Sequence, residues 1–370
     1  MSRSVAMLLG ALAATGLTGI VRADVTIEEQ VNVDGFGPTK FGALEGKNVT
    51  AIAADRARTE QRSQFKSRIL RALAKGSSVD TARIVRLDTE LIDEIDNSSK
   101  QYSEMSFQQM RDAAAAAAAQ GAQAQATEQK EAPSGAPVDE SKCQWSPPKA
   151  TIQQSGEHAS IAGADASRAT ITVTTTCTDP TKGTSCDFVF LLDEWLAADL
   201  PGIAEEKQFW LDYARKLNLG GELASMRSSS QAVFRRYQGG WGEAAKQAGT
   251  LKGYPVKTSF AMQFGGPQCK DSSANSSSGA PPPSSSDSGS GSGNIPTSPS
   301  AAVGNMAMGL FNKLHKKEDT AQSASPPVAP GMVQLFGMTV ETTAIRTAPI
   351  AAAAFEVPAG YAKIDKLITP

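Results

Sequence analysis

Apolar residues at the start of the chain form one block rather than an alternating pattern. A basic residue, Arg3, precedes a run of Ala, Leu, Gly and Val that ends in Val-Arg-Ala at positions 21–23. A positive start, an apolar middle and small residues before a cleavage point are typical of a secretory signal peptide. The run contains Thr and Gly and is shorter than the roughly 20 residues of a membrane span. We therefore expect residues 1–23 to be removed on export to the periplasm or the medium, so that the mature chain begins at Asp24.

Between residues 24 and 111 apolar and polar side chains alternate with a period of two, which predicts half-buried strands. One strand begins at Val25, and an extended run follows through Val49 to Thr59. Three runs separated by polar turns, at 83–88, 91–96 and 101–105, predict an antiparallel meander. Helical spacing predicts one amphipathic helix that ends near Gly76 and has one buried face, made of Phe65, Ile69, Leu70 and Leu73.

A second helix is expected where the meander ends. Ser106 and Gln109 have the spacing of a capping box, and the helix they open would run into the alanines at 113–119. Residues 112–142 are therefore assigned to this helix end and to an Ala/Gln-rich linker.

The segment 143–269 repeats the strand pattern and forms the predicted second half of the fold, with a helical insert. A helix stripe follows Pro201-Gly202, and a further helix is expected at 231–237. The clearest strand runs to residue 264, with its other side expected to face water through Ser259 and Gln263. Its apolar side is a candidate ligand face, made of Phe260, Met262 and Phe264.

Beyond residue 269 the pattern breaks. Residues 270–300 are Ser, Gly, Pro and Asn with few apolar side chains, and 318–330 also have the composition of a linker. Closing strands are expected within 331–370. Between the linkers, 301–317 predicts an amphipathic helix that either docks as a lid or on a membrane surface, or packs as core; its apolar stripe includes Met306, Leu310, Phe311 and Leu314.

Composition limits the partners. The 370 residues carry a formal net charge of -2, with 20% charged and 40% hydrophobic residues. This gives enough apolar material for a core, and no basic field that would attract nucleic acid. After residue 23 no segment is apolar and long enough to cross a bilayer.

Four cysteines in an exported chain favour two disulfides. Cys177 and Cys186 flank a turn-rich loop between two strand-like runs, so we expect them to bond across a hairpin, which leaves Cys143 with Cys269. Three connectivities exist, and the sequence does not choose among them. A zinc site is the alternative, but the chain has no Cys-x-x-Cys.

The sequence shows no catalytic pattern and no cofactor motif. His158, in a predicted turn, and His315, at a basic helix end, are the only histidines, and neither lies in a Gly-x-Ser-x-Gly context. The carboxylates Asp88, Asp93, Glu94 and Asp96 resemble paired hydrolytic acids, but a solvated strand face explains them. We therefore expect a protein that is not an enzyme, with a hydrolase as a remote alternative.

Several short motifs, taken in order, resemble the DUF4412-type family of exported bacterial proteins of unknown function. That family is similar to periplasmic lipoprotein carriers and lipoprotein-sorting proteins. The resemblance implies an incomplete antiparallel barrel cupped around helices, and it transfers no catalytic residues. The motifs are Ile84–Asp88 through Tyr102–Met105, Ile161–Gly163, Glu194–Ala197, Gly253–Val256 and Phe355–Tyr361.

The strand patterns favour the same fold class, α+β and mainly antiparallel, because strands with one apolar face need helices or a ligand to cover that face. The leading functional hypothesis is a periplasmic binding or carrier protein for a lipid-like or lipoprotein-like acyl ligand. A cell-envelope scaffold that binds a protein partner and no small ligand is the alternative.

Overall fold

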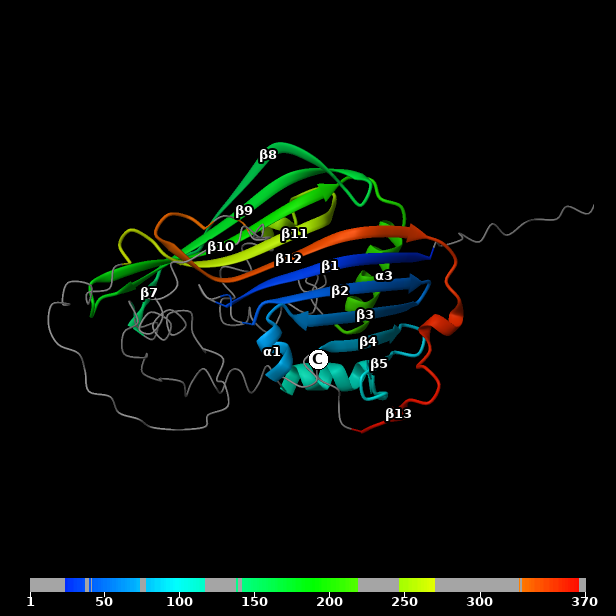
Figure 1. Cartoon of the computed structure of the whole chain (residues 1–370). Coiled ribbons are helices and arrows are strands. Elements are labelled where there is room, and N and C mark those ends of the chain that lie inside the picture. Colours follow the sequence, from blue (N-terminus) through cyan, green and yellow to red (C-terminus); the bar gives the residue numbers. More distant parts are fainter. Residues whose placement is uncertain are drawn as a thin grey trace, which may run out of the picture.

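The alternating segments become strands of one large antiparallel sheet in a computed structural model of the chain (Figure 1). The structure describes residues 24–36, 40, 42–73, 78–116, 138, 142–218, 246–269, 326 and 328–365. Its strands are β1 (Val25–Phe36), β2 (Leu44–Ala53), β3 (Arg56–Phe65), β4 (Val79–Arg86), β5 (Leu91–Asp96), β6 (Gln101–Ser106), β7 (Gln144–Trp145), β8 (Lys149–Ile161), β9 (Ala164–Asp179), β10 (Thr184–Ala197), β11 (Tyr254–Gly265), β12 (Met332–Thr347) and β13 (Ala362–Lys363).

The strand order places the first strand, β1, beside the late strand β12 in the middle of the sheet. It runs β13-β6-β5-β4-β3-β2-β1-β12-β11-β10-β9-β7, with β8 also paired to β9. The first strand, β1, pairs with β12, and only the short β13–β6 contact is parallel. The sheet is open, because its two outer ends do not pair with each other. The expected mainly antiparallel, open sheet is therefore confirmed.

Two apolar clusters lie on the same face of this sheet, which we call the inner face. The first, the α3 cluster, joins Val25, Ile27 and Ile52 to Phe107 and to Phe209 of helix α3 (Ile203–Lys216). The second, the aromatic cluster, lies across β9–β12, and Val33 of β1 packs against it. Val25 and Val33 share a parity on β1, so both clusters occupy one face.

Helix α3 crosses one end of the inner face, as Figure 1 shows. It begins after Gly202, whose φ is +81° and whose position would bring a side chain to 2.6 Å from Val25 Cγ2. It ends near the β4–β5 turn, where Lys216 Nζ lies 2.8 Å from Glu90 Oε1. The predicted stripe is confirmed, because Phe209, Ala214 and Leu217 are buried.

The C-terminal segment packs on the opposite, outer face of β4 and β5. The 3-10 helix η5 (Ala352–Phe355) places Phe355 in a buried cluster with Ile84 and Ile95. Arg58 Nη1 donates to the carbonyl oxygen of Ala354 at 3.4 Å. Backbone pairing of β13 with β6 then holds the end of this segment at the sheet edge.

Both disulfides form, but the expected pairing is wrong. Cys143 bonds to Cys177 and Cys186 bonds to Cys269, with Cα–Cα distances of 5.2 Å and 4.6 Å. The β9–β10 register already aligns Cys177 with Cys186, and each of them lies beside the end of another segment. The bonds therefore attach the segments at 143 and 269 to the hairpin rather than cross-linking the hairpin itself.

The predicted capping box is confirmed. Gln109 N–H donates to Ser106 Oγ at 3.2 Å, and Ser106 N–H donates to Gln109 Oε1 at 2.8 Å.

Two other elements differ from the sequence-based expectation. The extended run through 49–59 is a β2–β3 hairpin rather than one strand. The predicted amphipathic helix is reduced to α1 (Arg68–Leu73), where Ile69 is 71% exposed, so a buried face there is wrong. The expected helix at 231–237 lies outside the described residues.

Candidate functional site

The aromatic cluster contains the predicted ligand face. Phe260, Met262 and Phe264 lie on the inner side of β11 and are 3%, 6% and 2% exposed. The Phe188 and Phe264 rings lie 4.7 Å apart between centroids. Within the described part of the chain, the non-strand residues that pack against this cluster are Val138, Cys143, Ala248, Leu251 and Cys269.

The other side of β11 does not face water, contrary to expectation. Ser259 and Gln263 are buried, and the hydroxyls of Ser259 and Thr339 lie 3.0 Å apart. Gln263 Oε1 accepts a hydrogen bond from Ala329 N–H at 3.2 Å. Hydrogen bonding to neighbouring segments thus allows polar side chains to be buried in this central strand.

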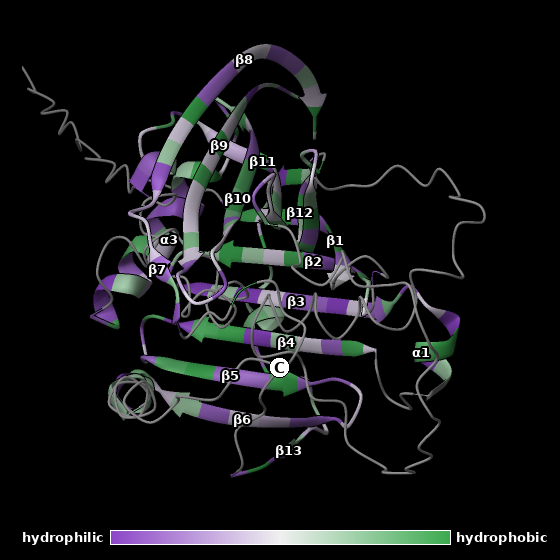
Figure 2. Cartoon of the chain, turned by 90° about the vertical axis from the view of Figure 1, so that its left-hand side faces the viewer, coloured by the Kyte–Doolittle hydropathy of each residue, from purple (hydrophilic) through white to green (hydrophobic). Residues whose placement is uncertain are grey.

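A polar band crosses the inner face between the two apolar clusters. On β1, Glu29 lies between Ile27 of the α3 cluster and Val33 of the aromatic cluster. Register pairing continues the band through β2, β3 and β4, and the mostly hydrophilic β3 is visible between β2 and β4 in Figure 2. Its members in register are Thr342, Glu29, Asn48, Gln61 and Thr81. Glu194 and Thr258 lie one inner-face position further along, because Thr258 pairs with Val340 rather than with Thr342.

Glu194 is the buried carboxyl at the β10 end of this band. It continues the inward parity of Phe188, Phe190 and Leu192 and is 9% exposed. The uncharged residues Ala169 and Thr258 lie directly opposite it on β9 and β11. Burial, and then the nearby charge of Asp193, raise the pKa of Glu194 to about 7.

The neighbouring Asp193 points to the outer face and is fully paired. Arg168 Nε and Nη2 donate to its two oxygens at 2.8 Å and 2.9 Å. The Arg168 guanidinium also lies 5.8 Å from the centre of the Trp195 ring and bonds to Glu157. Arg168 therefore pairs with carboxylates on the outer face of the sheet and does not pair with Glu194.

A second charged pair lies on the inner face near α3. Arg83 Nε donates to Glu94 Oε1 at 2.5 Å, and both residues lie near Tyr213 of α3. Burial raises the pKa of Glu94 against the opposing effect of Arg83.

The four acidic residues considered as hydrolytic acids do not converge. Asp93 and Glu94 point to opposite faces of β5, and each bonds to its own arginine, with Arg86 Nη2 2.6 Å from Asp93 Oδ2. Asp93 is only 1% exposed, so a solvated strand face is also wrong for it. Asp96 instead caps the turn that follows β5 by accepting from Ser98 N–H.

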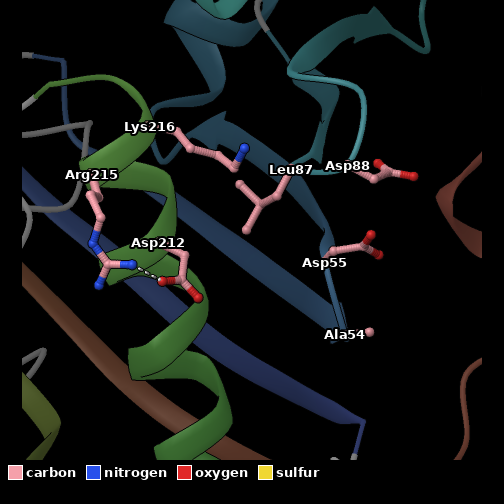
Figure 3. Close-up of a pocket in the computed structure, with 7 residues that line it drawn as sticks. All are labelled: Ala54, Asp55, Leu87, Asp88, Asp212, Arg215 and Lys216. Carbon is pink, nitrogen blue, oxygen red and sulfur yellow. Dashed lines mark hydrogen bonds and ion pairs between the residues drawn. The ribbon is translucent and has the colours of Figure 1, made fainter.

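A separate open cleft lies where the C-terminal half of α3 meets the β2–β3 and β4–β5 turns (Figure 3). Its volume is about 330 Å³, and Leu87 contributes its apolar part. Arg215 Nη1 bonds to Asp212 across one rim at 2.8 Å. The remaining lining residues are Ala54, Asp55, Asp88 and Lys216. Because acidic and basic side chains both line the cleft, its charge does not favour one class of ligand.

The other candidate residues from the sequence do not lie together in one site. His158 lies in β8 opposite Ser167, not in a turn, and its Nδ1 is 3.1 Å from Asp165 Oδ1. His315 and the 301–317 stripe, like the leader at 1–23, lie outside the described residues. In the described ranges no three His, Cys, Asp or Glu side chains are grouped to hold a metal ion. No helix in those same ranges is long and apolar enough to span a membrane.

No known protein family, curated protein or solved structure matches the chain. Sequence reasoning identified the aromatic cluster but missed the polar band. One signal was available, because Glu29 and Glu194 each interrupt an apolar parity that the neighbouring residues keep.

Proposed function

We propose that the protein is a non-enzymatic, exported binding or carrier protein for a lipid-like or lipoprotein-like acyl ligand. The observation that carries this proposal is the division of the inner face into an aromatic cluster and a polar band within an unclosed sheet. A single-chain amphiphile has the same division, with an apolar chain and a polar head. The apolar chain would lie between the inner face and the segments that cover it, as apolar ligands lie in sites lined by hydrophobic and aromatic side chains.

The proposal includes the finer fold and the route of the protein. The curved sheet would act as an incomplete barrel cupped around its helices, as in the DUF4412-type family and the lipoprotein carriers that the sequence resembles. Residues 1–23 would direct export, after which the two disulfides form in an oxidising compartment. The 301–317 helix would serve as a lid or docking segment for the ligand.

Uptake of a fluorescent 12-carbon acyl probe by the delipidated mature chain tests this function. Saturable binding that dodecanol displaces is expected. Met262→Gln places an amide in the aromatic cluster and should weaken uptake about tenfold, since burying an unpaired amide is unfavourable. Thr151→Gln on exposed β8 is the control and should bind as the parent does. Absence of uptake by the parent protein would refute the proposal.

A cell-envelope scaffold without a small ligand is the second candidate. The burial of Phe260, Met262 and Phe264 against the chain's own residues favours it, since a filled inner face needs no ligand. In that case the long linkers would let the parts of the protein reach a protein partner. Crosslinking in intact cells should then recover a specific partner, and its absence would reject this candidate.

A further inference from the structure

Glu194 occupies a position in the inner face that the function proposed above leaves without a role. The residue is 9% exposed and lies beside the aromatic cluster, at the β10 end of the polar band. A buried carboxyl normally has hydrogen-bond donors around it, because its desolvation is costly. No hydrogen bond or ion pair joins Glu194 to another side chain in the described part of the chain.

The residues that face Glu194 on the neighbouring strands carry no positive charge that could pair with its carboxylate. Ala169 and Thr258 face Glu194 directly, and the next inner-face positions on β9 and β11 are Ile171 and Phe260. The Arg168 guanidinium is bound to Asp193 on the other side of the sheet. The raised pKa of Glu194, to about 7, reflects this isolation.

A ligand head can complete the site if it donates hydrogen bonds. An ammonium group would supply both a donor and a positive charge, which makes the strongest kind of partner for a desolvated carboxylate. A hydroxyl would supply a donor only, and a carboxylate head would add a second negative charge beside Glu194.

We propose that Glu194 determines head-group specificity, so that the preferred ligand is a single-chain amphiphile with an amine head. The apolar chain lies along the aromatic cluster, and the amine donates to the Glu194 carboxylate at the edge of the polar band. This inference rests on the proposed carrier function and names the ligand class for the same face.

Three probes with the same 12-carbon chain test the inference: dodecylamine, dodecanol and dodecanoate, each below its micelle concentration. They compete with the fluorescent acyl probe for the delipidated full mature chain. Near pH 8 the amine should bind about tenfold or more tightly than dodecanoate, because a hydrogen bond to a charged group is worth roughly that factor. Glu194→Gln should remove this preference while dodecanol binding stays within about twofold.

The control variant is Glu341→Gln, which removes an equal charge from the outer side of β12, where Glu341 pairs with Lys257 at 2.8 Å. It should keep the amine preference. Equal binding of all three probes, or a preference that survives Glu194→Gln, would overturn the head-group inference while the carrier function stands. Failure of every probe to bind would overturn the carrier function, and the inference with it.

Discussion

Cys177 and Cys186 lie directly opposite each other in the β9–β10 register, yet each is bonded to a cysteine outside the hairpin. The bonds join residues that are 34 and 83 positions apart. Bonds of this kind restrict the unfolded chain far more than a link across the tight hairpin would. They hold Cys143 and Cys269 against the aromatic cluster.

Peptide mapping of the unreduced protein should therefore recover Cys143 with Cys177 and Cys186 with Cys269. The double variant Cys186→Ser/Cys269→Ser should lose roughly 2–5 kcal/mol of unfolding free energy in a urea titration. Recovery of a Cys177–Cys186 peptide from the parent protein would show that the structure has the wrong connectivity.

The Glu194 carboxyl should make stability depend on pH. Its pKa rises from 4.5 to about 7 on folding, so the neutral form is the one that the fold favours. The unfolded chain releases this proton at lower pH than the folded chain does, and stability should fall as the pH rises from about 4.5 to about 7.

Glu194→Gln keeps the side chain neutral and removes this loss. Near pH 8 the variant should be more stable than the parent by about 3 kcal/mol at most, and near pH 4.5 the two should be equally stable. Urea unfolding at both pH values measures the difference. A parent protein that is the more stable one near pH 8 would show that Glu194 is charged and well paired in the fold.

Sequence patterns predicted the strands well where one side of a strand is apolar. The parities of Val25 and Ile27, and of Phe188 and Phe190, identify their inner faces directly. Strand order could not be predicted in this way. The pairing of β1 with β12 joins residues about 300 positions apart, and no local sequence pattern specifies such a pairing. The buried second side of β11 was missed for the same reason, since Gln263 is buried by a contact with distant Ala329.

The candidate site was predictable in its apolar half only. Alternation identified Phe260, Met262 and Phe264 as one face, but it could not show that Glu29 and Glu194 lie on that same inner face of the sheet. Their shared face depends on the registers of four strands taken together. Disulfide pairing was unpredictable on similar grounds, because register alignment brings cysteines close without deciding which of them bond.

Phe355 should be the main anchor of the C-terminal segment on the outer face. It is the buried residue of the segment in the cluster with Ile84 and Ile95, and the neighbouring residues of the segment add partly buried contacts and hydrogen bonds, such as that of Ile350 N–H with Asp24 Oδ2 at 2.7 Å. Phe355→Ala should cost about 3–5 kcal/mol in unfolding free energy. Phe355→Leu keeps most of the buried volume and should cost less than about 1.5 kcal/mol.

Limited proteolysis provides a local readout for the same variants. Phe355→Ala should expose the chain after residue 347 to cleavage, while Phe355→Leu should protect it as the parent does. Equal protection in all three proteins would mean that the β13–β6 pairing, not Phe355, holds the segment.

The capping box at the end of β6 should contribute measurably to the helix at 107–116. Ser106→Ala removes the acceptor of the Gln109 N–H bond and should cost about 1 kcal/mol. Ser160→Ala on exposed β8 is the matched control, with a change within about 0.5 kcal/mol. Thermal unfolding of both variants beside the parent decides whether the cap contributes; equal midpoints would contradict it.

Native mass spectrometry of the disulfide-bonded protein, isolated without detergent, is the most direct test of the carrier function. Comparison of the spectra before and after solvent extraction shows whether an apolar molecule accompanies the chain. A carrier should show a bound mass of one amphiphile per chain that disappears on extraction, with an amine among its polar groups. A clean mass equal to that of the chain alone with two disulfides, unchanged by extraction, would contradict the carrier function and favour the scaffold.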